Sequence, residues 1–482
     1  MIKRVLIAVS ALAIAGAGAL AVVWGQARLD TAGKLRFERP LRIPPLEEGR
    51  PGARGERVYD LRVQQGTADL GADVPARTWG VNGPHLGPTL RVRRGERVRM
   101  RVRNDLPEPT TMHWHGMHLP AVADGGPHQP IGRGETWTPT WRIDQPAATL
   151  WYHPHPHART EHHVARGVAG MVLVADERER SLALPREYGV DDIPVILQDV
   201  RLDDEGNVSK ASISFSPIGH LGDRMLVNGT PDPHVVVRRE RVRLRLLNAS
   251  TARIHDVGLA DGRPMTLVAT DGGLLEHPAE VRRVRLSPGE RAEVVVRLRP
   301  RERLVLRSHP HGLGGDPWSR RFAGGDDRLD LLQLRAARTL ERSPEVPERL
   351  AAGPPEPDPA GATRTRRFEL SGRTINGRRM DMGRIDEVVR RDETEIWEVS
   401  SNSLHSFHIH DVQFRVLEID GRPPPPALRG PKDTILFEGR STARLAVRFT
   451  DYADPRTPYM FHCHLIDHED RGMMNQLVVT PP

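Results

Sequence analysis

Cysteine is almost absent from this chain of 482 residues, which has a single one, Cys463. One cysteine excludes an intramolecular disulfide framework and any zinc module built from several thiolates. Lysine is also scarce, so arginine carries nearly all the basic charge behind a formal net charge of +7. The lysines are Lys3, Lys34, Lys210 and Lys432.

Aromatic residues are few as well, at 5% of the chain. The arginines are dispersed along alternating segments such as residues 90–102, beside acidic residues. A nucleic-acid-binding surface instead clusters its basic residues and interleaves them with aromatic ones. We therefore expect no nucleic-acid partner and interpret the arginines as the solvated faces of strands.

Long apolar runs are missing except near the start, where Lys3 and Arg4 precede the run Val5–Trp24. A positive charge followed by an apolar stretch indicates an export signal. The run is longer than a typical cleaved signal and could just span a bilayer. Residues 1–27 are thus predicted to be a signal peptide or an N-terminal membrane anchor, without a clear twin-arginine motif. We expect a periplasmic or extracellular protein.

One short pattern occurs three times. In each copy an Asn-Gly pair precedes an arginine-rich alternating segment and, farther on, a histidine. The asparagines of the copies, Asn82, Asn228 and Asn376, lie 146 and 148 residues apart. Nearly equal spacing and the same internal order indicate three tandem copies of one domain, in line with about 150 residues per domain.

Within each copy polar and apolar residues alternate, as along Arg97–Arg103, and the whole chain has Gly 44 and Pro 42 for turns. This pattern predicts half-buried strands and an all-β protein of three tandem β-sandwich domains, at residues 36–178, 190–341 and 367–482. Prolines crowd residues 342–366. They exclude a helix and predict an extended linker, with a lid as the alternative.

Histidine is abundant, with 22 residues, and four short segments place two histidines two positions apart. On a strand, residues i and i+2 project to the same face, so each pair presents two imidazoles to one side. Eight such histidines exceed the needs of one metal ion and suit a cluster of several. The segments are His113-Trp114-His115, His153-Pro154-His155, His408-Ile409-His410 and His462-Cys463-His464.

Cys463 lies between two of these histidines, so its sulfur projects away from the imidazoles of His462 and His464. A thiolate with two histidines and a weak axial methionine is a blue-copper electron-transfer site. His405, His468 and Met473 complete that set. We therefore predict a mononuclear copper on one face of the strand and the multi-metal cluster on the other.

These segments resemble the signatures of the multicopper oxidases, especially the three-domain bacterial group of copper-efflux oxidases and bacterial laccases. The resemblance covers nearly the whole chain after the export segment, and residues 461–474 are its most specific part. It implies cupredoxin-like Greek-key domains and four copper ions. By motif position, type 1 copper takes His405, Cys463, His468 and Met473; type 2 copper takes His113 and His408; one type 3 copper takes His115, His153 and His464, and the other takes His155, His410 and His462.

The resemblance also implies roles for two acids. Asp124 and Glu469 stand where the family has carboxylates beside the cluster that deliver protons. Reduction of dioxygen to water consumes protons, so nearby general acids make chemical sense. The alternative interpretation is that both acids only complete hydrogen-bond networks.

The chain departs from the family at several positions. Ala158 stands where the family usually has Gly, and His163 where it usually has Gln. The methionine-rich insert of copper-efflux oxidases is missing, and Met380-Asp381-Met382 lies near its place. Soft sulfur with a carboxylate suits Cu(I), whereas methionines that fill a core gap are the alternative.

Other histidines mimic or flank the motifs. In the second copy, His255, His309 and His311 occupy comparable places without a complete partner set, so we expect no copper there. The flanking histidines are interpreted either as groups that orient ligands or as ordinary surface residues. They are His118, His128, His157, His162 and His163.

The sequence thus predicts an exported, monomeric copper oxidase that oxidises phenols or low-valent metal ions such as Cu(I) and Fe(II) and reduces O2 to water. Copper nitrite reductase is a rival that needs no four histidine pairs. A second rival is a non-catalytic structural relative such as the cell-division protein of this fold, a class in which ligands are lost. A third is copper storage, which would not require the cysteine link.

Overall fold

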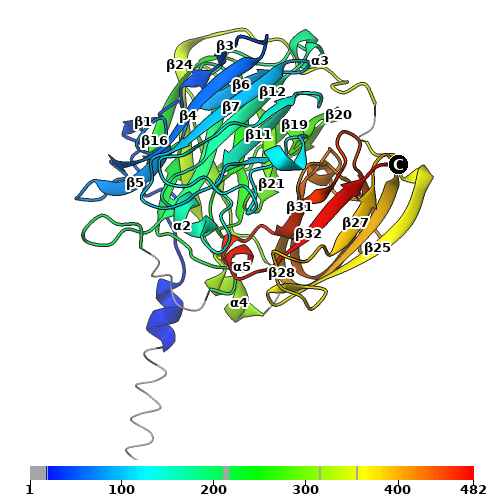
Figure 1. The fold of residues 1–482 in the computed structure, drawn as a ribbon. Coiled ribbons are helices and arrows are strands. Elements are labelled where there is room, and N and C mark those ends of the chain that lie inside the picture. The colour runs from blue at the N-terminus through cyan, green and yellow to red at the C-terminus, as the bar shows by residue number, and fades with distance from the viewer. Residues whose placement is uncertain (1–17, 19, 210–215, 314–315, 354–355) are drawn as a thin grey trace, which may run out of the picture.

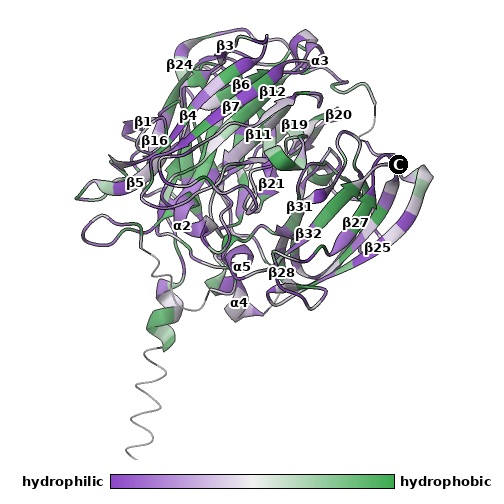
Figure 2. Ribbon diagram, viewed as in Figure 1, coloured by the Kyte–Doolittle hydropathy of each residue, from purple (hydrophilic) through white to green (hydrophobic). Residues whose placement is uncertain are grey.

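Strands dominate the computed structural model, which describes residues 18 and 20–482 except 210–215, 314–315 and 354–355. Figure 1 shows the first and second copies packed together and the third, in yellow to red, against their side. The expectation of an all-β protein is confirmed. Figure 2 shows the alternation of polar and apolar residues as stripes along β6 (Thr89–Arg93) and β7 (Arg97–Asn104).

The first copy is built from two sheets. One has the order β10-β7-β4-β3, with β5 beside β4 and β9 beside β7; the other has the order β2-β6-β12-β11-β8. Their remaining bounds are β2 (Leu46–Glu47), β3 (Arg50–Pro51), β4 (Arg57–Ala68), β5 (Ala76–Val81), β8 (His113–His115), β9 (Thr136–Trp137), β10 (Thr140–Arg142), β11 (Ala148–His153) and β12 (Gly170–Ala175), with η1 (Ala121–Ala123), α2 (Thr160–Val164) and α3 (Glu177–Ser181) between or after them.

The second copy also has two sheets, in the orders β15-β14-β13-β17-β22-β19-β20 and β16-β24-β23-β18-β21. Their bounds are β13 (Asp192–Val200), β14 (Arg224–Val227), β15 (Thr230–Pro231), β16 (Pro233–Arg239), β17 (Arg241–Asn248), β18 (His255–Leu259), β19 (Met265–Thr270), β20 (Gly273–Val281), β21 (Arg283–Leu286), β22 (Arg291–Arg297), β23 (Arg303–Ser308) and β24 (Leu329–Glu341), with α4 (Pro317–Phe322) before β24. The short strand β1 (Arg39–Pro40) pairs in parallel with β16. The start of the expected first domain, residues 36–178, therefore joins a sheet of the second copy.

The strands of the third copy form one continuous sheet in the order β26-β25-β28-β31-β32-β27, with β30 pairing with both β28 and β29. Their bounds are β25 (Ala362–Ser371), β26 (Thr374–Ile375), β27 (Glu387–Arg390), β28 (Thr394–Ile409), β29 (Arg415–Ile419), β30 (Thr434–Arg448), β31 (Asp454–Cys463) and β32 (Met474–Thr480), with η2 (Pro359–Gly361), η3 (Pro426–Leu428) and α5 (Ile466–Asp470). β25 begins at Ala362, before the expected boundary at residue 367. The sequence did not indicate this earlier start because the first residues of the strand are exposed and show no apolar alternation.

The proline-rich segment between the second and third copies is fastened to the second copy. Leu350 is fully buried, and its backbone N–H donates to Glu276 O at 2.8 Å. Arg178 Nε in turn donates to Leu350 O at 2.7 Å, which ties the segment to the first copy as well. A linker held in this way acts as a strap across the two copies.

The two largest of five hydrophobic clusters among the described residues form the main cores. One is confined almost entirely to the second copy, whereas the other runs without a break from the first copy into the third. The shared core contains Trp114 of the first copy and Phe407 and Cys463 of the third. Because interiors pack at crystal-like density, a shared core fixes the first and third copies against each other and holds the seam between them rigid.

Most of the expected signal or anchor, residues 1–17 and 19, lies outside the described residues. Residues 20–26 are helical, and the Trp24 ring lies 5.7 Å from that of Trp318 on α4. Within the described part of the chain, no helix has both the length and the apolar character of a bilayer span.

The repeated Asn-Gly pairs have one structural role in all three copies. Asn82, Asn228 and Asn376 adopt φ of 54°, 50° and 52°, in the left-handed region that asparagine tolerates. In each case the side-chain oxygen accepts a backbone N–H and the side-chain amide donates to a backbone carbonyl. The repeat therefore marks the turn that clamps each sandwich.

Asn228 is the buried member of this set, so it provides the test. Asn228→Ala removes bonds to Ile196 N (2.8 Å) and Pro194 O (2.9 Å) and leaves alanine at positive φ. We expect the free energy of unfolding to fall by about 2–4 kcal/mol, measured by urea denaturation. Asn228→Gly keeps the backbone conformation and should cost less; an equal cost would contradict a role for the positive φ.

Candidate metal centres

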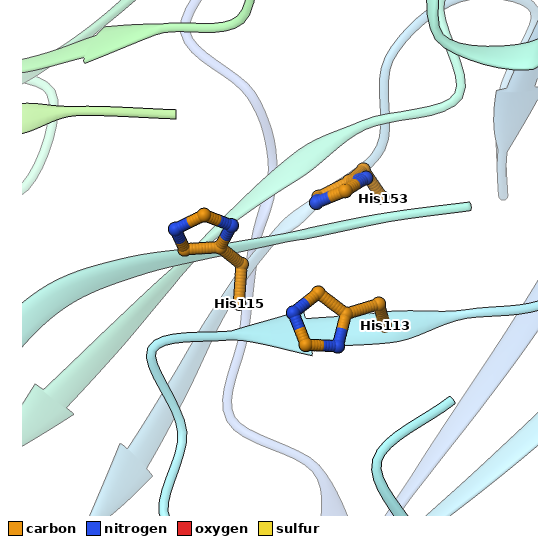
Figure 3. Close-up of side chains that lie close together, drawn as sticks. All are labelled: His113, His115 and His153. Carbon is orange, nitrogen blue, oxygen red and sulfur yellow. The ribbon is translucent and has the colours of Figure 1, made fainter. Parts of the chain in front are cut away.

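Two strands of the first copy, β8 and β11, bring three predicted ligands together. They run antiparallel, with His113 opposite His153 and His115 opposite Trp151. Figure 3 shows the rings of the three histidines gathered around a common space. All three side chains are buried, and His155 follows directly after β11.

The third copy supplies the facing half. β28 and β31 run antiparallel, with His408 opposite His462 and Phe407 opposite Cys463. Imidazoles of the two copies stack across the seam: His115 on His408 with ring centroids 3.7 Å apart, and His113 on His410 at 3.9 Å. The eight paired histidines thus form one buried group, called here the histidine cluster.

Most imidazoles of the histidine cluster are held through one nitrogen and present the other. The Nδ1 atoms of five histidines contact backbone or side-chain oxygens: His113 with Asp124 O at 3.0 Å, His153 with Pro154 O at 2.9 Å, His408 with Asp433 O at 2.8 Å, His410 with Asp124 Oδ2 at 2.8 Å and His462 with Cys463 O at 3.2 Å. Among the described residues, the Nε2 atoms of His113, His153 and His408 have no hydrogen-bond partner.

The free nitrogens converge in a way that fits a metal. Nε2 of His155 and Nε2 of His410 each lie 3.2 Å from Nε2 of His462. This is the separation of neighbouring ligands on an ion with metal–nitrogen bonds of about 2.0–2.1 Å. Burial lowers the pKa of His462 to about 3 and puts the pKa values of His155 and His410 well below their usual range, so all three rings are neutral and able to bind.

His464 differs from the other histidines of the cluster, because neither of its ring nitrogens has a hydrogen-bond partner among the described residues. Gly289 of the second copy packs against this ring. A Cβ at position 289 would stand 3.0 Å from His464 Nε2, and the residue has φ of +87°. Glycine at this position therefore gives the ring its room.

The opposite face of β31 carries a second group of donors, the cysteine site. Cys463 Sγ lies 3.6 Å from Nδ1 of His405 and 3.6 Å from Nδ1 of His468, and these two nitrogens lie 3.2 Å apart. Met473 is buried, and its backbone O accepts from Cys463 N at 3.0 Å. Burial raises the pKa of the Cys463 thiol to about 12, so at neutral pH a bound cation is needed to hold a thiolate.

Both predicted acids contact the histidine cluster. Asp124 bonds His410 through its carboxylate and His113 through its backbone oxygen. The oxygens of Glu469, on α5, lie 3.3 Å from Nδ1 of His155 and 3.3 Å from Nδ1 of His462. Burial raises the pKa of Glu469 well above its usual range, which favours the protonated carboxyl.

Sequence reasoning missed Asp433, whose carboxylate lies within reach of His115 and His408. His115 Nε2 contacts its Oδ1 at 3.1 Å, so the ring of His115 presents Nδ1 instead of Nε2. Asp433 is also bound by Arg291, with Nη2 to Oδ2 at 2.6 Å. The one signal in the sequence is Lys432-Asp433, a charged pair just before the short apolar run Ile435–Phe437.

The flanking histidines are held by other groups. His118 contacts Asp451 and Gln413, His128 contacts Gln476, and His163 contacts Thr110 and Glu108. His162 lies 3.7 Å from Glu108, and His157 is exposed. In the second copy, His311 Nε2 donates to Ile254 O. No group of three metal-binding side chains among the described residues includes His255, His309 or His311.

The departures from the family pattern have structural counterparts. Ala158 adopts φ of 60°, a conformation that favours glycine. The loop with Met380, Asp381 and Met382 lies beside the turn that leads to Met473, since Met380 N donates to Gly472 O at 2.8 Å. Asp381 and Met382 are exposed.

The chain thus has three β domains, and the histidine cluster, which could hold metal ions, lies in the seam between the first and the third. This is the arrangement expected of a multidomain copper protein. Residues 62–179, 198–306 and 351–482 match three family models, each described as multicopper oxidase. The chain belongs to the multicopper oxidase family, and its domains are cupredoxin-like.

Similar proteins carry more than one kind of name. A multicopper oxidase of Staphylococcus haemolyticus is 33% identical over 452 residues, covering 91% of this chain and 92% of the relative. A cell division protein FtsP of Xenorhabdus nematophila is 37% identical over 446 residues, covering 92% of each chain.

Similar solved structures include laccase-like and metallo-oxidase proteins. A laccase-like multicopper oxidase of Ochrobactrum sp. is similar with a TM-score of 0.83 and 38% identity, covering 92% of this chain and 100% of the other. A multicopper oxidase of Campylobacter jejuni, described as a metallo-oxidase, has a TM-score of 0.79 and 26% identity, covering 94% and 98%.

Cys463→Ser tests the cysteine site. We expect the copper-loaded wild type to show the intense absorption of a copper–thiolate bond, and the variant to lose this absorption together with about one copper per chain. The histidine cluster should keep its metal, because the sulfur points away from it. Absorption spectra and metal analysis measure both effects, and a variant that stays blue would show that Cys463 is not the ligand.

Proposed function

We propose that the chain is a copper-dependent oxidase that couples one-electron oxidation of phenols or low-valent metal ions to reduction of O2 to water. The observation that supports this most is the set of buried imidazole nitrogens that converge without protein partners. Burying an unsatisfied polar group costs free energy, and a purely structural protein would gain nothing in return. Bound metal would satisfy these nitrogens.

The donors fit copper, and we assign four ions to them. His405, Cys463, His468 and Met473 would hold one ion at the cysteine site, where soft sulfur and imidazole favour copper. The eight paired histidines would hold three more in the sets implied by the family motifs. Bound copper would supply the one-electron redox chemistry; the protein binds the reductant, orients the ligands and provides protons.

The reductant is proposed to bind beside His468. A surface pocket of about 710 Å³ is lined by His468, Ser403, Arg373 and Arg440, among others. His468 Nε2 donates to Pro217 O at 2.9 Å, which fixes the ring at the edge of this pocket. Cys463 joins this site to the histidine cluster, because His462 and His464 are its neighbours on the chain. Phenols and metal ions are both small enough for such a pocket.

Protons are proposed to come through Asp124 and Glu469. Glu469 holds a proton within 3.3 Å of two ligand rings, while Asp124 fixes a third and fourth ring through its two contacts. A buried, protonated carboxyl at this position can release its proton toward reduced oxygen. The N-terminal segment would place the whole reaction outside the cytoplasm.

A non-catalytic copper-binding or structural role is the second candidate. Similarity to proteins named cell division protein FtsP favours it. The two candidates differ in one measurable property, namely turnover of O2 by copper-loaded protein.

Oxygen uptake therefore tests the function. We expect copper-loaded protein to consume O2 with a phenol, with Fe(II) and with Cu(I) as separate reductants, and Cys463→Ser to abolish uptake with all three. Full copper loading without uptake would instead support the structural candidate.

The same assay tests whether the loop beside Met473 binds Cu(I). Met380→Leu/Asp381→Asn/Met382→Leu keeps volume and removes sulfur and charge. We expect it to lower uptake with Cu(I) while uptake with the phenol stays unchanged, because only the metal ion needs soft ligands. Equal loss with both reductants would show damage to packing, and no loss would exclude a docking site.

The acids are tested by Asp124→Asn and Glu469→Gln. Each should slow O2 reduction by about 10²–10⁴-fold, the usual contribution of general acid–base groups. Stopped-flow reduction of the cysteine site by substrate should keep a near-normal rate, because the carboxyl groups of both acids face the histidine cluster. Wild-type turnover by both variants would show that the acids only complete hydrogen-bond networks.

A further inference from the structure

Arg291 is a buried cation of the second copy that bonds to all three copies. Its Nε donates to Thr149 O of the first copy at 3.0 Å, and Nη2 donates to Asp271 O of its own copy at 3.0 Å. Nη1 and Nη2 donate to the two carboxylate oxygens of Asp433 in the third copy, at 2.8 and 2.6 Å. The fork of the guanidinium thus matches the carboxylate in a two-pronged pair.

Asp433, in turn, holds one imidazole from each side of the seam. Its Oδ1 accepts from His115 Nε2 at 3.1 Å, and its backbone O accepts from His408 Nδ1 at 2.8 Å. The hydroxyl of Thr434 donates to the same Oδ1 at 2.9 Å. The stacked pair of His115 and His408 is therefore fixed from behind by one residue.

This contact decides which nitrogen His115 offers. Five other histidines of the cluster are held through Nδ1, whereas His115 is held through Nε2 and its Nδ1 has no partner among the described residues. The nitrogen that binds metal is set by the hydrogen bond made by the other nitrogen. Asp433 Oδ1 has to be held where it accepts the hydrogen bond from Nε2 of His115.

A cation is needed behind Asp433 because an isolated buried carboxylate is costly. Arg291 provides it, and the pair belongs to a larger network. Lys432 Nζ lies 2.8 Å from Asp271 and 2.7 Å from Glu290, and Asp271 Oδ1 accepts from Arg291 N at 2.7 Å. Both acids, like Arg291, belong to the second copy, so that copy supplies most of the network.

We propose that Arg291 is a positioning residue for the histidine cluster, through which the second copy, without a copper site of its own, sets the metal-binding nitrogen of His115. The inference rests on the copper sites proposed above. Arg291 acts through Asp433 and touches no proposed ligand.

The experiment compares Arg291→Met with Arg243→Met as a matched control. Arg243 is equally buried, on the neighbouring strand β17, and pairs with Glu293 and Glu179 but with no histidine of the cluster. Copper affinity, the type 2 electron paramagnetic resonance signal, the blue absorption and the melting temperature of the metal-free protein are measured for each variant.

Both variants should melt at lower temperature. Only Arg291→Met should weaken copper binding at the cluster, by about 10–100-fold, and lose the type 2 signal while the blue absorption of the cysteine site stays. If both variants keep full copper and a normal type 2 signal, Arg291 only stabilises the fold and the proposal is overturned. If the wild type binds no copper at the cluster, the proposed function itself fails.

Asp433→Asn, which has nearly the same shape, shows whether Arg291 acts through the carboxylate. In a double-mutant cycle, Arg291→Met should lower copper affinity much less when residue 433 is already Asn, because the two changes affect one contact. The same fold-loss with Asp or Asn at position 433 would overturn the proposal. Arg291→Lys keeps the charge and, if Arg291→Met does not fold, replaces it in the comparison.

Discussion

Burial of many neutral imidazoles together is the constraint on which the structure depends. The rings of the histidine cluster are removed from water, and each protonated ring would repel its neighbours, so burial and neighbouring rings depress their pKa values. Neutral rings can donate through one nitrogen and accept or bind through the other. The fold has to fix the first nitrogen of each ring with protein oxygens and direct the second to a shared space.

Such a space requires rigid walls, and the architecture supplies them in an unequal way. The first and third copies share a hydrophobic core, so their strand ends cannot slide across the seam. The second copy closes the seam from the side. It contributes Gly289 against His464, Arg291 behind Asp433 and the carbonyl of Pro217 to His468. A copy without a complete ligand set among the described residues therefore still contributes to each proposed metal site.

Local patterns made much of this predictable. The i, i+2 spacing of the histidines and the position of Cys463 between two of them follow from the geometry of one strand, so the sequence alone indicates two sites on opposite faces. The turns at Asn82, Asn228 and Asn376 are local as well. Asp433 and Arg291 are different: they are 142 residues apart, and Asp433 is 318 residues from His115. Single charged residues at such separations look like surface residues until the three copies are assembled. Strand β1 was unpredictable for a similar reason, because only its partner β16 shows which copy it joins.

Overall similarity does not decide what a protein of this fold does. Relatives named multicopper oxidase and relatives named cell division protein are about equally identical to this chain. The informative residues are those that do not favour folding by themselves. Buried nitrogens of His153, His408 and His464, which have no hydrogen-bond partner among the described residues, destabilise the metal-free protein. Binding of metal to the native state alone would reverse that cost, since a ligand stabilises the state that it binds. The unpartnered imidazole nitrogens, which do not favour folding by themselves, are therefore the physical basis for assigning a function to this chain.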